Sequence, residues 1–505
     1  MSENTLSGTK TSTSEDTNTK ELFSHKRDRK DKTYETEIFS VFDYRELEKR
    51  NLEIKKAAEK GTPESVLKEK LIANLKEEKG IKAITIAFCD LEGKLHTLDY
   101  DKNYFLDALD NLTLDGSSIK GFTELKNSDL RLQPDWKSFR YLPADIFGAG
   151  KGMMFGFLCN EDGSFFPSDF RGQLQQFTEK LAQKKITAYG APEIEGFLLR
   201  GTNAEQHFDQ IKGFELVTEG GYFSTLPQDE MRLFIDKVAE VQRALAFENE
   251  KDHGEVAPST FEINFRYTEV LTMCDQMLIY KLTARQVAKL MGFTASFLPK
   301  PVAGISGSGM HMNISLGNEK NLFWDAQDKE KISPLGKKFI AGILHYASEL
   351  CLTICPSVNS YRRLDPHFEA PNEIKYSMCD RTSMIRIPLG NERSSRVEVR
   401  SVSPDVNPYL ALYTLLKAGL SGIEKDIPLP SGTPKTLWGN IQDAINSFEN
   451  SAFMKDILGK TEHEKYLNLK KNVANRSPLL LGKKIKQSEI IHHHEITNQM
   501  LWSDF

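Results

Sequence analysis

A chain of 505 residues, 39% hydrophobic and 27% charged, has the composition of a globular protein and is long enough for two or more hydrophobic cores. Its 66 Lys and Arg residues against 71 Asp and Glu residues give a net charge of -5, which argues against nucleic-acid binding because proteins that bind nucleic acid are usually basic. No apolar run approaches the roughly 18 to 20 residues of a membrane-spanning helix, so we expect no membrane association.

Residues 1–40 are rich in Ser, Thr, Asn, Asp, Glu and Lys and poor in apolar side chains. Such a segment cannot bury enough apolar surface to offset the entropy lost on ordering, so we predict a disordered N-terminal extension. The six cysteines are scattered, and the sequence carries no signal peptide. These features predict free thiols in a reducing cytoplasm.

Two helices are predicted next, near residues 44–60 and 64–79, and the second is opened by the "TPES" start signal, in which Pro63 suits a first helical turn. The segments "IKAITIAFCD" and "GKLHTLDY" have the pattern of strands, with a turn at Leu91 to Gly93 between them. This part of the chain is therefore predicted to contain two helices followed by a pair of strands.

From about Asn160 the chain alternates predicted helices with short strands. Apolar residues recur at helical spacing in "FRGQLQQFTEKLAQKK", "DEMRLFIDKVAEVQRALAF", "QMLIYKLTARQVAKLMGF" and "KKFIAGILHYASELCLTIC". The strands between these helices carry acidic side chains, which is unusual for segments that are otherwise apolar.

Six acidic or imidazole side chains lie inside strand-like or glycine-rich segments: Glu193, Glu195, Glu255, Glu262, His311 and Glu398. Carboxylates in such surroundings are costly unless they are paired or bind a cation. Because residues two apart on a strand share a face, Glu193 and Glu195 project together, and a divalent cation or an arginine would relieve their repulsion. Oxygen ligands with one histidine favour Mg²⁺ or Mn²⁺ over Zn²⁺. For any single glutamate, the alternative is a surface carboxylate paired with lysine.

An arginine-rich, loop-rich stretch follows a helix that ends near Pro356. It carries Arg362, Arg363, Arg381, Arg386, Arg393, Arg396 and Arg400. Arginine matches phosphate and carboxylate oxygens with two parallel hydrogen bonds, so this run beside carboxylates indicates a phosphoryl-transfer site. The alternatives are a solvated charged face and nucleic-acid binding, and the acidic balance of the chain weakens the second of these.

Seven segments, in order, resemble the signatures of glutamine synthetases of the bacterial type I class. They are "LTLDGSSIKGFTELKNSDLRLQPD", "APEIEGFLL", "HGEVAPSTFEINFRY", "TASFLPKPVAGISGSGMHMNISL", "PSVNSYRRLDPHFEAP", "RTSMIRIP" and "VEVRSVSPDVNPYLALYTLLKAGLSGI". The resemblance runs from roughly Val41 to the C-terminus. It implies an α+β fold, with a small β-grasp domain at residues 41–150 and a catalytic domain at residues 151–505, built on an open, barrel-like antiparallel sheet with helices.

The resemblance also implies a metal site with two or three Mg²⁺ or Mn²⁺ ions. Glu195, Glu255 and Glu262 match the ligands of the metal nearest glutamate and ammonia. Glu193, His311 and Glu398 match those of the metal that holds the ATP phosphates. Other matched positions would contact glutamate (Glu195, Gly307, His311, Arg363, Glu369 and Arg400), the transferred phosphate (Arg381 and Arg386), and the rest of ATP (Glu250, His253, Tyr267, Ser315 and Arg396).

The implied reaction is ATP-dependent formation of glutamine from L-glutamate and ammonium, through γ-glutamyl phosphate. Asp90 matches an aspartate that a neighbouring subunit donates to bind ammonium, and Glu369 matches the glutamate of a flap that closes the site. Asp90, Glu369 and Arg381 are thus the expected catalytic residues. A dodecamer of two hexameric rings with shared active sites is the expected assembly.

Some positions depart from the family pattern. Ser306 stands where an asparagine usually precedes "GSGMH", and Thr260 and Phe261 replace a glutamine and its polar neighbour. These departures keep open a related ligase that joins glutamate to a polyamine or another amine. A non-catalytic structural or regulatory member is a further alternative, although such a protein would usually have lost ligands, and all six are present.

Overall fold

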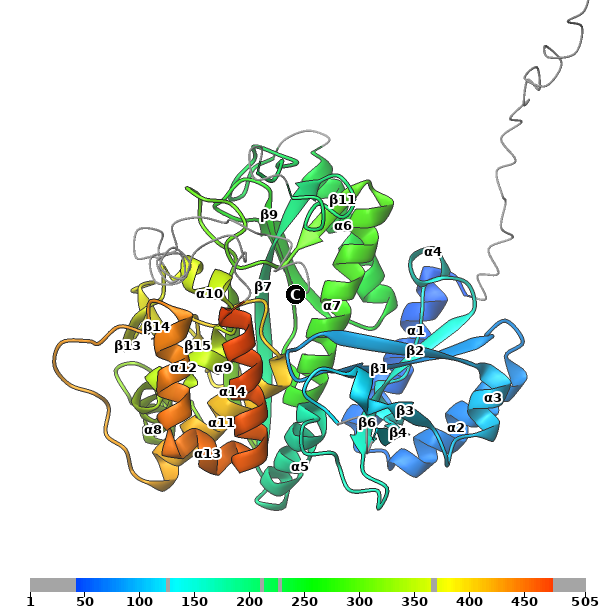
Figure 1. Ribbon diagram of the computed structural model, residues 1–505, viewed down its shortest axis with the longest axis horizontal. Helices are drawn as coiled ribbons and strands as arrows, with labels where there is room; N and C mark the ends of the chain where they lie inside the picture. Colours follow the sequence, from blue (N-terminus) through cyan, green and yellow to red (C-terminus); the bar gives the residue numbers. More distant parts are fainter. Residues whose placement is uncertain (1–41, 124–127, 209–212, 226–228, 365–369, 476–505) are drawn as a thin grey trace, which may run out of the picture. The chain divides into compact units, whose positions relative to one another are not determined.

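The computed structural model describes residues 42–123, 128–208, 213–225, 229–364 and 370–475, which belong to one compact unit (Figure 1). The predicted N-terminal extension and the predicted flap residue Glu369 lie outside the described residues. Within these ranges, no helix is long and apolar enough to cross a membrane.

Helices α1 (Tyr44–Glu59) and α2 (Glu64–Glu77) lie close to the predicted ranges. The Asp43 side chain caps α1 by accepting the backbone N–H of Glu46 at 2.8 Å. Asn51, buried on α1, donates to the carbonyls of Tyr141 at 2.9 Å and Ala244 at 2.7 Å. This one side chain therefore joins α1 to two segments that are far apart in the sequence.

The first sheet has six strands in the order β2-β1-β6-β4-β3, with β5 paired to β6. The strands are β1 (Ala83–Cys89), β2 (Leu95–Asp101), β3 (Thr113–Asp115), β4 (Asp129–Pro134), β5 (Arg140–Tyr141) and β6 (Lys151–Cys159), accompanied by α3 (Lys102–Asp107) and α4 (Ala144–Phe147). The predicted turn at Leu91 to Gly93 joins the antiparallel strands β1 and β2, whereas β1 and β6 are parallel.

The extent of this sheet moves the boundary between the two parts of the chain. The predicted boundary at residue 150 falls just before β6, although β6 pairs with β1, β4 and β5. A strand that is bonded to three others of one sheet belongs to that sheet, so we place the boundary after Cys159.

The second sheet has nine strands in the order β13-β14-β15-β12-β7-β9-β8, with β10 and β11 also paired to β7. They are β7 (Thr187–Arg200), β8 (Asn249–Gly254), β9 (Thr260–Phe265), β10 (Thr268–Glu269), β11 (Phe293–Ser296), β12 (Met310–Gly317), β13 (Glu373–Ser377), β14 (Ser383–Arg386) and β15 (Val397–Val399). All pairs are antiparallel except β13 with β14. The long strand β7 is the centre of this sheet (Figure 1).

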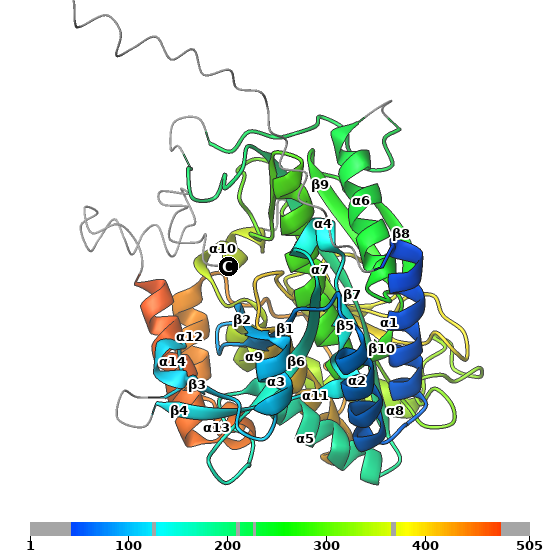
Figure 2. The same ribbon diagram turned by 90° about the vertical axis from the view of Figure 1, so that its right-hand side faces the viewer.

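Helices accompany the second sheet, and they are α5 (Phe170–Gln183), α6 (Glu230–Ala244), α7 (Val270–Leu290), α8 (Pro334–His345), α9 (Ala347–Ile354), α10 (Val358–Arg363), α11 (Pro408–Glu424), α12 (Ile441–Asn450), α13 (Ala452–Leu458) and α14 (Lys460–Ala474). α7 runs alongside β7, and α12, α13 and α14 form a group (Figure 2). The predicted helical segment 337–355 forms two helices, because helical structure is interrupted at Tyr346 between α8 and α9. One continuous hydrophobic core connects both sheets with these helices.

Helices α8 and α11 approach closely at two glycines. A Cβ on Gly342 would lie 2.2 Å from the carbonyl oxygen of Ala418, and one on Gly422 would lie 2.2 Å from that of Lys338. Both obstacles are backbone atoms, which cannot move aside without displacing a helix.

We therefore expect Gly342→Ala to lower the free energy of unfolding by about 1–3 kcal/mol, the usual cost of overpacking a tight contact. Gly439→Ala is the matched control, since a Cβ on Gly439 meets no atom within 4 Å. The measurement is the thermal unfolding midpoint of both variants and the parent. Equal midpoints for the two variants would contradict the tight helix contact.

Candidate active site

Polar side chains on six neighbouring strands form a row across the second sheet. Directly opposite pairs along this row are Arg386 with Glu398, His311 with Glu193, and Glu195 with Glu262. His253 on β8 continues the row, because it lies opposite Glu262. Opposite residues of paired strands share a face, so the row places all these side chains on one side of the sheet.

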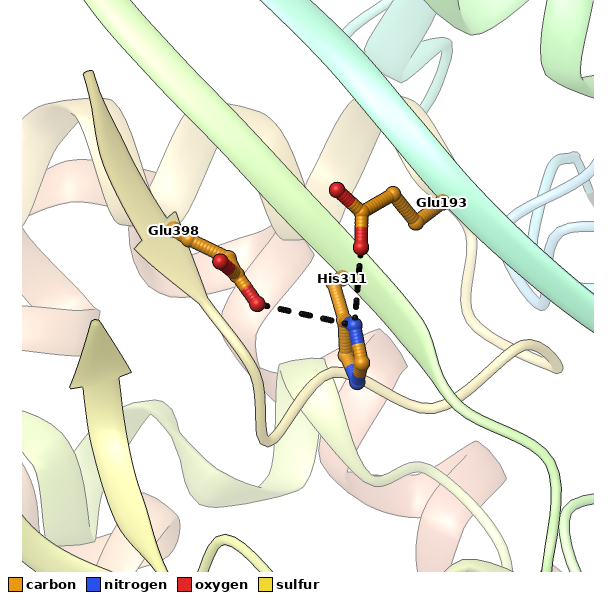
Figure 3. A group of neighbouring side chains, drawn as sticks. All are labelled: Glu193, His311 and Glu398. Carbon is orange, nitrogen blue, oxygen red and sulfur yellow. Dashed lines mark hydrogen bonds and ion pairs between the residues drawn. The ribbon is translucent and has the colours of Figure 1, made fainter. Parts of the chain in front are cut away.

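A first cluster contains Glu193, His311 and Glu398, from β7, β12 and β15. Figure 3 shows the imidazole of His311 between the two carboxylates, and its Nδ1 lies 3.2 Å from Glu193 Oε2 and 3.6 Å from Glu398 Oε1. Asn313 Nδ2 donates to Glu193 Oε1 at 3.2 Å. Burial opposes ionisation of Glu193, yet the hydrogen bond and charge of His311 lower its pKa to about 2. Glu193 is therefore held as a carboxylate.

A second cluster contains His253, Glu255 and Glu262. His253 lies 3.3 Å from Glu255 and 3.8 Å from Glu262, measured between ring nitrogens and carboxylate oxygens. Burial and the charge of Glu195 raise the pKa of Glu255 to about 7, and burial with the charges of Glu195, Glu193 and Glu255 raises that of Glu262 to about 9. Carboxyl groups so close together resist ionising together.

Both clusters fit a divalent cation. Each offers three ligand atoms within 4.8 Å of one another, with carboxylate oxygens in the majority. A cation would compensate the mutual repulsion that raises the pKa of Glu255 and Glu262. This is the donor set, carboxylates with histidine, from which the sequence predicts Mg²⁺ or Mn²⁺, and the identity of the ion stays a prediction.

Close backbone approach forms one wall of the same pocket. A Cβ on Gly307 would lie 2.4 Å from the carbonyl oxygen of Pro299, and one on Gly309 would lie 2.6 Å from Arg363 Nη2. The Gly309 N–H donates to Glu195 Oε2 at 2.8 Å. A side chain at position 307 would meet backbone, and one at position 309 would displace the Arg363 guanidinium, so at both positions glycine lets the backbone itself form this wall.

The turn before β9 is held in a strained backbone conformation. Ser259 has a φ of 61°, in the left-handed region that residues other than glycine rarely adopt. Its buried hydroxyl accepts the backbone N–H groups of Val217 at 2.7 Å and Thr218 at 3.1 Å and donates to the carbonyl of Leu198 at 2.9 Å. These bonds fix the start of β9, which carries Glu262.

Arginines line the pocket beside the acids. Arg363 is buried and anchored, since Nη1 donates to the carbonyls of Ser401 and Val402 at 3.2 Å and Nη2 to that of Arg400 at 2.9 Å. Burial lowers the pKa of Arg363. Arg386 and Arg400 both bond the carboxylate of Glu398, at 2.7 and 2.6 Å. Glu398 is thus paired on both of its oxygens.

The candidate active-site pocket, which we call the catalytic pocket, has a volume of about 220 Å³. It is lined by every member of the two acidic clusters except Glu398, and also by Glu195, Ser306, Gly307, Arg363, Arg381, Arg386, Arg396 and Arg400. A second pocket, also of about 220 Å³, adjoins it and is lined by Glu250, Tyr267, Ser315 and Arg396. The two pockets share Glu193, Lys251 and Arg396. Four of the five predicted ATP contacts therefore gather in the second pocket, while His253 lies in the second acidic cluster.

Asp90 is not brought to the catalytic pocket of its own chain. It is buried in the turn after β1, where Oδ1 accepts the backbone N–H groups of Glu92, Gly93 and Lys94 at 2.9–3.0 Å. Its Oδ2 lies 3.0 Å from His96 Nε2. Asp90 thus shapes a turn, and its expected contact with a neighbouring subunit stays a prediction.

Sequence reasoning missed several polar residues of the site: Tyr222, Lys251, Asn264 and Asn313. Asn264 donates to Glu262 at 2.6 Å, and Arg396 Nε donates to Asn313 at 2.8 Å. Each asparagine stands two residues after a predicted ligand on the same strand. Strand alternation applied to Glu262 and His311 could therefore have identified both.

The fold and the site define a two-domain α+β protein whose larger sheet presents acids, histidines and arginines to one pocket. The family model described as "Glutamine synthetase, catalytic domain" matches residues 167–477, and "Glutamine synthetase, beta-Grasp domain" matches residues 80–160. The chain therefore belongs to the glutamine synthetase family, and it is a ligase of that family.

Individual relatives agree with this assignment. The glutamine synthetase of Thermotoga maritima is 33% identical over 421 residues, which cover 78% of this chain and 93% of that protein. That of Thermus thermophilus is 32% identical over 434 residues, 80% of this chain and 94% of that protein. Among solved structures, Plasmodium falciparum glutamine synthetase has a TM-score of 0.76 at 19% identity, and a GmaS/ADP complex has 0.71 at 25% identity, each covering 83% of this chain and 98% of the other.

Proposed function

We propose that the protein ligates ammonia to the γ-carboxylate of L-glutamate at the expense of ATP, giving glutamine, ADP and phosphate. The observation that carries this proposal is the cross-strand row that joins two acidic clusters to arginines in one pocket. Ammonia cannot displace an oxide ion from a carboxylate in water, so the γ-carboxylate is first phosphorylated by ATP. The resulting acyl phosphate then has a good leaving group.

The catalytic pocket and the second pocket would each hold one of the two anionic substrates. Glutamate would lie in the catalytic pocket, with its carboxylates near Arg363 and Arg400 and its backbone against Gly307. ATP would lie in the second pocket, with its adenine beside Tyr267 and Arg396. Because the two pockets share residues, the γ-phosphate of ATP bound in this way would lie close to the glutamate side chain.

Charge control at the junction would fall to the acids and arginines. Arg381 and Arg386 would neutralise the transferred phosphoryl group as it moves between oxygens. Glu193, His311 and Glu398 would hold one divalent cation, and Glu195, Glu255 and Glu262 another. Bound there, Mg²⁺ or Mn²⁺ supplies electrophilic stabilisation of phosphate charge. His253, in contact with Glu255 and Glu262, would orient these carboxylates.

Ammonium must lose a proton before it attacks the acyl phosphate. We propose that Asp90 of a neighbouring subunit, together with Glu369, attracts the cation and accepts its proton. This proposal requires an assembly with shared sites, and we propose a dodecamer of two hexameric rings in the cytoplasm.

One pair of observations favours an amine as the second substrate. Ser306 and Thr260, two of the departures from the family pattern, both line the catalytic pocket. The second candidate function is therefore ligation of glutamate to an organic amine.

The test is phosphate release from ATP and glutamate with ammonium, methylamine or spermidine as the only nitrogen source. We expect release with ammonium, dependent on glutamate and on a divalent cation. Release with an amine but not with ammonium would replace the first proposal by the second. No release with any of the three would reject both, and would favour a non-catalytic member of the family.

A further inference from the structure

The edge strand β8 has one residue more than its partner β9 at the place where the two pockets meet. Asn249 lies opposite Phe265, and Asp252 lies opposite Ile263, so three steps along β8 correspond to two steps along β9. The extra residue falls between Asn249 and Asp252. Such a bulge interrupts the alternation of a strand, and it can bring two consecutive side chains to the same face.

The two residues that flank the bulge both point to helix α6. Asn249 Nδ2 donates to the carbonyl of Ala239 at 3.0 Å, and Asp252 pairs with Arg232 at 2.7 Å. Ala239 and Arg232 belong to α6, which lies beside β8 (Figure 2). The flanking side chains are therefore turned away from the face of the sheet that carries the acidic clusters.

The bulge leaves the two residues between them, Glu250 and Lys251, on the pocket side of the strand. Both residues line the second pocket, although they are consecutive in the sequence. Lys251 also lines the catalytic pocket, which Glu250 does not. The bulge therefore places a lysine at the junction of the two pockets, where a regular strand would present only one of these two side chains.

Lys251 differs from the other two residues that the pockets share, because it has no partner. Glu193 accepts a hydrogen bond from Asn313 at 3.2 Å, and Arg396 donates one to Asn313 at 2.8 Å. Among the residues that the structure describes, the Lys251 side chain forms no hydrogen bond, and no carboxylate oxygen lies within 4.0 Å of its Nζ. Its charge nevertheless reaches the site: burial lowers the pKa of His253, and the charge of Lys251 lowers it further. The ammonium group is free to bind a ligand.

The position of Lys251 selects one part of one substrate. In the proposed function, ATP lies in the second pocket with its adenine beside Tyr267, so the group that reaches the catalytic pocket is the terminal phosphate. The carboxylates of glutamate would lie near Arg363 and Arg400, which leaves the ammonium group of Lys251 for the phosphate. Lysine is a common ligand of phosphate oxygens, which it binds as a point charge.

We infer that Lys251 binds the terminal phosphate of ATP and thereby makes the site prefer ATP to ADP. The inference rests on the proposed function, from which it takes the direction in which ATP lies. In the transfer, the γ-phosphorus exchanges its bond to the β-phosphate oxygen for a bond to the glutamate carboxylate oxygen, and no proton moves. Because Lys251 lines both pockets, its ammonium group stays beside the phosphoryl group before and after this step.

The test is calorimetric titration of the full-length protein with ATP and, separately, with ADP, at one saturating concentration of Mg²⁺ and without glutamate, so that no ATP is consumed. Lys251→Met is expected to bind ATP about tenfold to a hundredfold more weakly than the parent, since a hydrogen bond between charged groups is lost. Its affinity for ADP should stay within about threefold of the parent. Lys251→Arg keeps the charge and should keep most of the preference for ATP, and Lys251→Gln serves if Lys251→Met fails to fold.

The matched control is Lys184→Met, which alters an exposed lysine after α5 that lines neither pocket and should bind both nucleotides as the parent does. Equal affinities of Lys251→Met and the parent for ATP would overturn the inference. An equal loss for ATP and ADP would also overturn it, because Lys251 would then act on another part of the nucleotide. A parent that binds neither nucleotide would overturn both the inference and the proposed function. The expected binding preferences without phosphate release from any nitrogen source would reject the proposed function alone.

Discussion

Glu262→Ala is expected to reduce glutamine formation by about a thousandfold or more, the largest effect we predict for a single side chain. Glu262 contributes to the second acidic cluster and lies opposite Glu195 in the strand ladder. Alanine would remove one of the proposed ligands of a divalent cation. The measurement is phosphate release and glutamine formation at saturating ATP, glutamate and ammonium.

The same variant should not be less stable than its parent in the presence of a chelator. Burial and neighbouring carboxylates raise the pKa of Glu262 to about 9, so that ionising it costs the folded state. For an acid whose pKa is raised on folding, stability is fully present below the unfolded pKa and is lost as pH rises toward the folded pKa. Alanine at position 262 cannot ionise, so the variant does not lose this stability as pH rises.

The controls for this experiment are an exposed glutamate and the assembly itself. Glu240→Ala, on the exposed side of α6 and paired with Arg243 at 2.8 Å, should keep parental activity. Particle size should be unchanged in both variants. A Glu262→Ala enzyme that keeps activity close to the parent would remove Glu262 from the site, and a loss of activity caused only by unfolding would leave its proposed role without support.

Asp90→Asn and Arg381→Ala are each expected to lose activity by about a hundredfold or more, and to recover part of it when they are assembled together. Asparagine is the better choice at position 90 because its Oδ1 can still accept the three backbone N–H groups of the turn. If each site takes Asp90 from a neighbour, random mixing in equal amounts restores about a quarter of the sites, since each required residue is intact half the time.

Mass measurements on the mixed particles establish that both variants are present. Mixed assemblies as inactive as the two parents would show that Asp90 acts within its own chain or only as a turn residue. Activity of Asp90→Asn near the wild-type level would show that its charge is not needed. In either case the shared site would be withdrawn, while the acidic clusters would be unaffected.

Local pattern predicted much of the fold, because most elements are specified by residues close together in the sequence. The first two helices and the β1-β2 turn lie close to the predicted positions. The break at Tyr346 was not predicted, since the apolar pattern continues through it. The sequence predicts a domain boundary at residue 150, whereas β6 joins the first sheet through partners on β1, β4 and β5, which no local pattern reveals.

Local pattern predicts which side chains of one strand share a face, but not which strands lie side by side, so it predicts only part of the site. Strand alternation places Glu193 with Glu195 on one face, but it cannot say that His311, over a hundred residues later, lies opposite Glu193. That pairing is a property of the sheet. The place of His253 beside Glu255 and Glu262 also follows from strand register, and the resemblance alone assigned it to ATP.

The central strand β7 fixes the spacing between the two acidic clusters. Glu193 belongs to the first acidic cluster, and the charge of Glu195 acts on Glu262 of the second cluster. Two residues of extended chain span roughly 6–7 Å, which is the spacing along β7 between the residues that serve the two clusters. Substituting side chains can change what each group binds, but it cannot change this interval. Only an inserted or deleted residue in β7 could do so, and a shift of one residue would turn every later side chain to the opposite face. Substitutions in the pocket, such as those at Ser306 and Thr260, can therefore change the surroundings of a bound molecule without changing the distance between Glu193 and Glu195 along the strand.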